Sequence, residues 1–202
     1  MAMQGLPFDA KQVTTADGTY WDREVFSKDL AKYFGHITSN GILLGRGRTL
    51  IDELQVVNQG QNALVSTGYC MIEGRMGWLD KPEVVTFDIG GNQPRIDTVA
   101  VELNTSSQER RFKIVVIKGD EGTYPVPPQL TRNDTVYQLG LADIKRFANS
   151  SALGAITDTR RDANRCGIAA VDIPNNKFPD IYIEDTQFEA EMIDIYGNIV
   201  RA

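Results

Sequence analysis

Residues 95–119, RIDTVAVELNTSSQERRFKIVVIKG, decide the fold class of this chain. Two runs rich in β-branched residues, 95–103 and 111–119, flank the polar stretch NTSSQE. Such runs are typical of β-strands, and a polar spacer of this length is typical of a hairpin loop. The first run is apolar on one face near its far end. The second is apolar on both faces, so we expect both of its faces to be partly covered.

Further short runs of the same kind lie on either side of this hairpin, separated by turn residues. They are LQVVN (54–58), ALVST (63–67), YCMIEG (69–74), VVTFDI (84–89) and VYQLGLADIKRF (136–147). Because no helical pattern separates them, they predict an antiparallel sandwich or barrel. The three prolines of residues 123–137 predict a long extended excursion between two strands.

One amphipathic helix is predicted, in residues 27–41, SKDLAKYFGHITSNG. Ser27 is its expected N-cap, Asp29 suits the positive end of the helix dipole, and Asn40-Gly41 is the expected stop. Four apolar residues fall at i, i+3, i+4 and i+7 and form one stripe: Leu30, Tyr33, Phe34 and Ile37. A single amphipathic helix needs a surface, so we expect this stripe to lie on the sheet or at an interface.

Composition narrows the classes of partner. The 202 residues carry a net charge of −6, which argues against binding to nucleic acid or to an anionic membrane surface. The start of the chain lacks a secretory signal, and no apolar run reaches membrane-spanning length, so we expect the protein to be made and folded in a cytoplasm.

The residues needed for catalysis are scarce. His36 is the one histidine of the chain, and its place beside the apolar stripe predicts a solvent-facing side chain. Cys70 and Cys166 are too few and too far apart for a zinc site; we expect buried thiols, with a disulfide left open. The sequence therefore predicts no enzyme, no metal and no cofactor.

Residues 154–167, GAITDTRRDANRCG, combine carboxylates with guanidinium groups. Ion pairing of Asp158 and Asp162 with arginines such as Arg160 would keep both carboxylates ionised, which is the wrong state for a general acid.

The two ends of the chain differ from its middle. Residues 1–20 are polar and predict an irregular N-terminal arm. Residues 168–202 form a C-terminal extension in which PDIYIEDTQFEAEMIDIYGNIV (179–200) alternates acidic and apolar side chains, a pattern that suits adding a strand to the edge of a partner's sheet. Whether QFEAEMIDIYG is helix or strand stays open. The apolar residues expected to contact a partner there are Ile181, Ile183, Phe188, Met192 and Ile195.

The order of these pieces carries a resemblance: WDREVFSKDLAKYF and SNG, then VSTGYCMIEGRMG, the 94–119 hairpin, PPQLTRNDTVYQLGLADI and ITDTRRDANRCG. Over residues 21–167 the chain resembles the N-terminal module of baseplate and tail-tip structural proteins in tailed phages of Gram-positive bacteria. The family resemblance covers the upper-baseplate and receptor-binding-protein shoulder types.

The resemblance implies a mainly β fold: an antiparallel β-sandwich with one N-terminal amphipathic helix and extended terminal arms. It also implies a trimeric, non-enzymatic virion component that contacts other tail or baseplate proteins, and a structural role for Asp158, Arg160 and Asp162 in tying down the chain end. About 35 residues follow Gly167, too few for a separate receptor-binding head. We therefore expect an adaptor between the tail tip and receptor-binding components.

A carbohydrate-binding or host-receptor-binding module is the alternative. It predicts an exposed aromatic patch that stacks on sugars, with Trp21, Trp78 or Tyr124 as its members. A hydrolase is the weakest reading, because acid–base candidates are missing.

Overall fold

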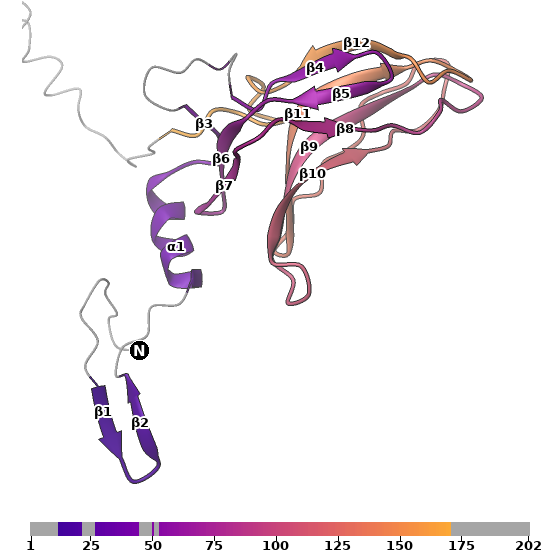
Figure 1. Cartoon of the computed structure of the whole chain (residues 1–202). Coiled ribbons are helices and arrows are strands. Elements are labelled where there is room, and N and C mark those ends of the chain that lie inside the picture. The colour runs from indigo at the N-terminus through magenta and orange to yellow at the C-terminus, as the bar shows by residue number, and fades with distance from the viewer. Residues whose placement is uncertain (1–11, 22–26, 45–49, 51–52, 171–202) are drawn as a thin grey trace, which may run out of the picture. The chain divides into compact units, whose positions relative to one another are not determined.

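A computed structural model describes residues 12–21, 27–44, 50 and 53–170 (Figure 1). The chain divides into two units, Met1–Val171 and Asp172–Ala202, and the second lies outside the described residues. The described residues form one helix and antiparallel sheets, so the predicted mainly β fold with a single N-terminal helix is confirmed. The strands are distributed over three sheets and a separate hairpin rather than two sheets alone.

The largest sheet has four strands in the order β10-β9-β11-β12. They are β9 (Arg95–Asn104), β10 (Arg111–Ile117), β11 (Val136–Arg146) and β12 (Leu153–Asp158). Strand β9 pairs with β11 along its whole length and with β10 over residues 98–104, and it is buried on both faces. The expectation of one apolar face in residues 95–103 was therefore incomplete. The polar side chains of the other face are buried as well, and they pair with polar side chains of the neighbouring strands. Strand β10, at the sheet edge, is half-buried on both faces, as its pattern predicted.

The other two sheets share one bent hairpin. Strands β5 (Asn62–Val65) and β8 (Glu83–Val85) pair at its base, and β6 (Gly68–Ile72) and β7 (Arg75–Leu79) pair at its tip. β4 (Val56–Gln59) extends the base half, and β3 (Gly41–Leu43) extends the tip half. The bend falls at Gly68, where a Cβ would lie only 2.5 Å from Leu54 N. A residue without a side chain is needed there, because two segments of backbone pass so closely.

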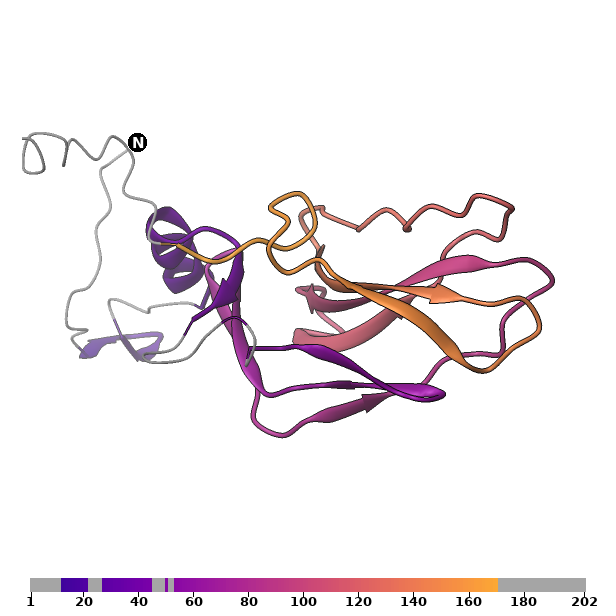
Figure 2. The ribbon, with the colours of Figure 1, turned by 90° about the horizontal axis from the view of Figure 1, so that it is seen from above.

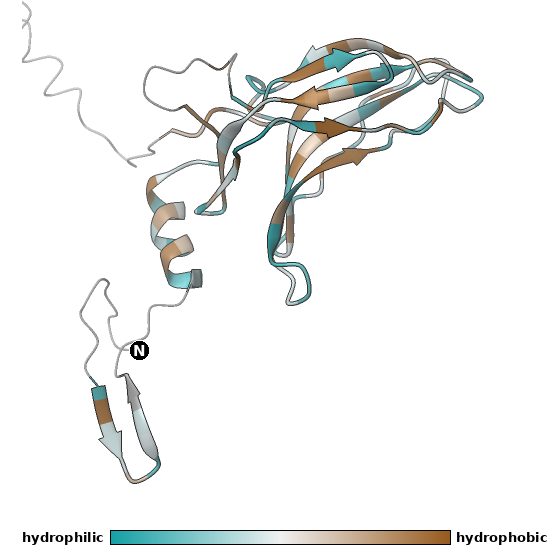
Figure 3. Ribbon diagram, viewed as in Figure 1, coloured by the Kyte–Doolittle hydropathy of each residue, from teal (hydrophilic) through white to brown (hydrophobic). Residues whose placement is uncertain are grey.

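The core lies where the sheets meet (Figure 2). Its buried apolar side chains come from the base of the bent hairpin, including Val56, Ala63 and Val65, and from the four-stranded sheet, including Val99 and Leu139. Figure 3 shows the same apolar bands along these strands, and a further one on the helix.

Three further features of the structure differ from what the sequence predicted. Residues 12–21 form a hairpin of β1 (Gln12–Thr15) and β2 (Gly18–Trp21), not an irregular lead-in; Gly18 at φ 134° makes the turn. Strands β7 and β12 were not predicted. Asn40-Gly41 does not end the helix: α1 (Ser27–Ile37) stops earlier, and Gly41 belongs to β3.

Candidate interaction surface

Helix α1 is tied to the rest of the protein just after its last turn. The amide and hydroxyl of Thr38 both donate to Phe34 O, at 2.9 and 2.8 Å, and close the helix. Asn40 Nδ2 then donates to Glu73 Oε1, and Glu73 N donates to Asn40 Oδ1, both at 2.7 Å. Glu73 lies in the turn between β6 and β7, so Asn40 holds the tip of the bent hairpin.

The side of α1 that touches the hairpin is made of small residues. A Cβ on Gly74 would lie 1.8 Å from Ala31 O, and a Cβ on Gly35 would lie 3.6 Å from Gly74 N. Gly74 also has a φ of 66°, a region that favours glycine. Ala31 and Gly35 thus let the helix backbone rest directly on the hairpin turn.

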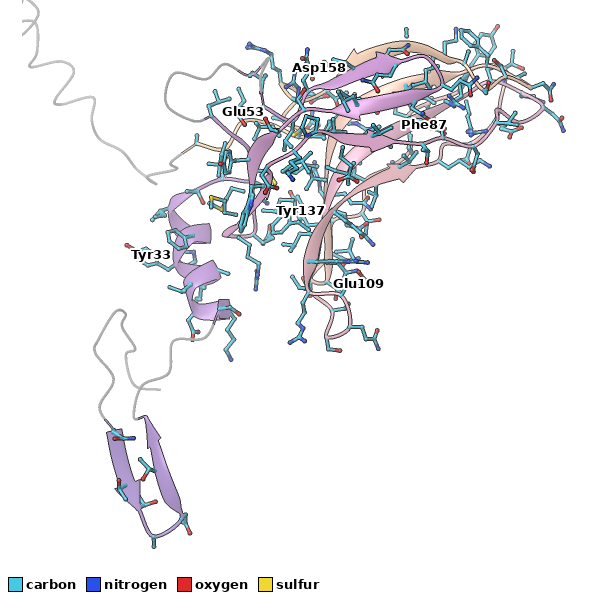
Figure 4. The ribbon with its side chains drawn as sticks, viewed as in Figure 1. Tyr33, Glu53, Phe87, Glu109, Tyr137 and Asp158 are labelled. Atoms are coloured by element: carbon cyan, nitrogen blue, oxygen red, sulfur yellow. The ribbon has the colours of Figure 1, made fainter. Side chains whose placement is uncertain are left out.

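The apolar stripe of α1 lies on a different side. At 100° per residue, the stripe is centred about a third of a turn away from Ala31 and Gly35. Its four residues are all exposed, from 38% to 54%: Leu30, Tyr33, Phe34 and Ile37. Tyr33 stands on the side of α1 turned away from β7 (Figure 4), and its ring meets that of Phe34 edge-on at 5.5 Å. The expectation that the stripe lies on the sheet is wrong, because small residues make that contact instead.

A second exposed apolar group lies on the tip half of the bent hairpin. Tyr69 is directly opposite Trp78 in the β6–β7 ladder, and Met76 follows on the same face. These three side chains, here called the hairpin patch, are 41% to 61% exposed. Trp78 was a predicted aromatic candidate. Tyr124 is 91% exposed in the proline-rich excursion, while the side chain of Trp21 lies outside the described residues.

A groove opens between β7 and β10. It encloses a volume of about 90 Å³, and apolar side chains such as Val101, Phe112 and Ile114 line it together with Trp78 and Lys113. The two strands come into contact where the ring of Phe112 packs on Gly77: a Cβ at residue 77 would lie 2.6 Å from that ring. Lys113 forms an ion pair of 3.0 Å with Glu102.

The segment around Asp158 forms a dense polar cluster. Arg160 Nε and Nη2 donate to the two carboxylate oxygens of Asp158 at 2.9 and 2.6 Å, and Arg160 Nη1 donates to Leu50 O and to Glu53 O. The Arg160 hydrogen bond lowers the pKa of Asp158. The backbone carbonyl of Asp162 accepts from the amides of Arg165 and Cys166, and its carboxylate accepts from Asn164 N at 2.9 Å. In the described structure Asp162 therefore closes a turn and does not form the ion pair with an arginine that the sequence predicted. Through Arg160 the segment after β12 is joined to residues 50 and 53; Figure 4 labels Asp158 and Glu53.

The chain beyond this turn returns to α1. Ile42 pairs in parallel with Ile168, Ala169 N donates to Ile42 O, and Ser39 N donates to Ala170 O. Residues 167–170 therefore extend the β3 edge next to the end of the helix.

Sequence reasoning missed a buried ion cluster at the N-terminal end of β9. Arg95 Nε donates to Asp97 Oδ1 at 2.8 Å, and Arg146 Nε lies 3.5 Å from Asp97 Oδ2. Burial lowers the pKa of Arg146, and the charge of Asp97 partly offsets this. Arg146 also donates to Asp88 O and stacks over Phe87 at 5.2 Å. The cluster fastens the 88–93 loop to the sheet. The signal was an aspartate in line with the buried residues Val99 and Val101.

Groups capable of catalysis are dispersed in the described part of the chain. His36 is exposed on α1. Cys70 and Cys166 are buried and free, and burial raises the pKa of each thiol to about 12. Among the described residues, no three His, Cys, Asp or Glu side chains are grouped as metal ligands. No helix in the same residues has the length and apolar character needed to cross a membrane.

Ile181, Ile183, Phe188, Met192 and Ile195, the predicted partner segment, lie outside the described residues. Comparisons of the chain with family models, with curated proteins and with solved structures gave no match. The described residues present two exposed apolar groups next to the contact between α1 and the bent hairpin: the α1 stripe and the hairpin patch.

Proposed function

We propose that this chain is a non-enzymatic structural protein of a phage tail or baseplate, which assembles as a trimer and connects the tail tip to receptor-binding components. The observation that carries the proposal is the exposed α1 stripe. A helix of 11 residues gains most of its stability from packing of its apolar face, yet this face has no cover within the described chain.

The occupant we propose for the stripe is the same stripe in other copies. Its residues are apolar and aromatic, so like surfaces are complementary to one another. The charge of the chain also permits close approach. The last 31 residues hold seven of the 27 acidic and two of the 21 basic residues, which leaves residues 1–171 with a net charge of −1. A nearly neutral surface opposes self-association very little.

The area required supports a role for the hairpin patch as well. A stable interface buries about 1,200–2,000 Å² in total, which is a larger area than a single short helix provides. Trp78 and Tyr69 are aromatic residues of the kind that dominate such interfaces.

The test is the molar mass of the full chain by analytical ultracentrifugation. We expect a trimer for the wild type and a monomer for the double variant Tyr33→Glu, Phe34→Glu. Lys32→Glu, on the same helix but outside the stripe, is the matched control and should remain trimeric. A wild type that stays monomeric at all concentrations would refute the assembly role. Detection of the chain in purified virions by mass spectrometry tests the tail assignment separately.

The exposure of Trp78 and Tyr124 supports a second candidate, a carbohydrate- or receptor-binding module. A monomer that binds cell-wall saccharide, and loses binding in Trp78→Ala, would favour that function over assembly.

A further inference from the structure

The groove between β7 and β10 lies between two sheet edges. β7 is the last strand of the β3-β6-β7 sheet, and β10 is the last strand of the four-stranded sheet. An edge strand presents unpaired N–H and C=O groups to any extended chain that lies beside it. At the opposite edge, Leu153 N of β12 donates to Gly60 O. Within the described residues no strand pairs with the outer edge of β10.

The exposed edge combines apolar lining with positive charge. Phe112 and Ile114 line the groove. Among the described residues of its lining, Trp78 is the most exposed apolar side chain and Glu83 is the one acidic residue. Residues 110–118, which include β10, contain four basic residues and no acidic one. Glu109 and Glu102 pair with two of them, Arg111 and Lys113, at 2.5 and 3.0 Å. An extended peptide that alternates apolar and acidic residues matches this surface.

The chain contains such a peptide. Residues 180–185, DIYIED, carry three acidic residues and no basic one, and they lie in the segment that holds −5 of the chain's net charge of −6. In an extended conformation Ile181 and Ile183 share one face. The peptide has six residues, close to the seven of β10.

We propose that residues 180–185 of a second copy bind along the outer edge of β10, with Ile181 and Ile183 in the groove and the acidic residues near its basic side chains. Added strands of this kind gain affinity from backbone hydrogen bonds and specificity from alternate side chains. Each copy then offers one segment and one groove, a head-to-tail contact that forms a ring when the rotation between copies closes and an open filament when it does not. This deepens the proposed function, because it names a contact that holds the copies together.

The test is the binding of a labelled peptide of residues 178–188 to the full chain by fluorescence anisotropy. The recipient carries Ile181→Glu and Ile183→Glu, so its own segment does not compete. We expect saturable binding that weakens as salt is raised, because part of the attraction is ionic. A scrambled peptide of the same composition is the control. Equal binding of the scrambled peptide would overturn the proposal.

Two recipient variants locate the binding site. Trp78→Ala, which removes an exposed aromatic side chain from the groove, should raise the Kd at least about tenfold. Lys145→Glu, at an exposed position on β11, should leave the Kd unchanged. Circular dichroism shows whether each variant is folded. Unchanged binding in folded Trp78→Ala, or equal loss in Lys145→Glu, would exclude the groove as the site.

The wild-type chain identifies the source of the segment. A segment from a second copy competes with the peptide more strongly as the protein concentration rises. Competition that is independent of protein concentration would assign the groove to the chain's own segment and overturn the proposal. The result is separable from the proposed function: peptide affinity tests the groove, whereas the molar mass of the stripe variants tests assembly through α1.

Discussion

Replacement of Arg160 by alanine should destabilise the protein more than any change to its neighbours in the polar cluster. The guanidinium is 2% exposed and donates to Leu50 O and Glu53 O, which belong to buried residues. Without Arg160 the carbonyl of Glu53 loses this donor, and Leu50 O keeps only the 3.3 Å hydrogen bond from Glu53 N. An unsatisfied buried group costs about 1–3 kcal/mol. The carboxylate of Asp158 is 51% exposed, so its ion pair adds about 1 kcal/mol at most.

The expected loss for Arg160→Ala is therefore about 3–5 kcal/mol, a large share of the roughly 5–15 kcal/mol of a typical domain. The assay is urea unfolding followed by far-UV circular dichroism. Arg161→Ala removes an exposed arginine next to it and should change stability by less than about 0.5 kcal/mol. Asp158→Asn should cost under about 1 kcal/mol.

If Arg160→Ala proves too unstable to purify, Arg160→Lys keeps the charge and one donor, and should show an intermediate loss. The reasoning fails if Arg160→Ala and Arg161→Ala have the same free energy of unfolding. That result would mean that water replaces the guanidinium at no cost, and that residues 50 and 53 are held by other contacts.

Three further outcomes are expected. Gly74→Ala should separate α1 from the hairpin turn, because its Cβ would collide with Ala31 O, and trypsin should then cut at Lys32 faster. Gly60→Ala shares the positive φ, at 83°, but its Cβ would meet nothing among the described residues, so it controls for backbone strain and should not change the rate. The stability difference between wild type and Asp158→Asn should be present at neutral pH. It should begin to shrink near the unfolded pKa of about 4 and disappear as pH falls through the lower folded pKa; equal differences at all pH values would contradict this. Cys70 and Cys166 should resist alkylation at pH 8 until the protein unfolds, and rapid labelling of the native protein would contradict this. The free energy of unfolding should fall as pH rises above the ordinary thiol pKa of 9.0, because only the unfolded thiols ionise there.

Strong strand composition was sufficient to find the central strands. Residues 95–103, 111–119 and 136–147 correspond to β9, β10 and β11. β-branched residues are frequent in the first two runs, and Val136, Tyr137 and Ile144 mark the third. Strand β7, RMGWL, was missed because arginine and glycine obscure its pattern. It forms a strand because β6 pairs with it and because Gly77 leaves room for Phe112.

The candidate surface shows a different limit. Periodicity identified which residues share the α1 stripe, but it did not show which side of the helix faces the sheet. That side is set by the contact of Ala31 and Gly35 with Gly74, which lies 39 residues or more further along the chain. The buried Arg95 and Arg146 were missed for a similar reason. A charged residue in a strand normally faces water. Arg95 reaches Asp97 from two positions away on the same strand, but only the register of β9 on β11 brings Arg146 to it.

The pairing of β3 with residues 167–170 has a consequence for the synthesis of the protein. The hydrogen bond between Ser39 and Ala170 joins residues 131 positions apart, so the N-terminal third must wait for almost the whole folded unit to leave the ribosome. A chain terminated before Arg160 would also lack the guanidinium that holds residues 50 and 53. Prematurely terminated chains should therefore be more susceptible to proteases. A chain translated past Ala170 can form both the pairing of Ser39 with Ala170 and the Arg160 contacts with residues 50 and 53.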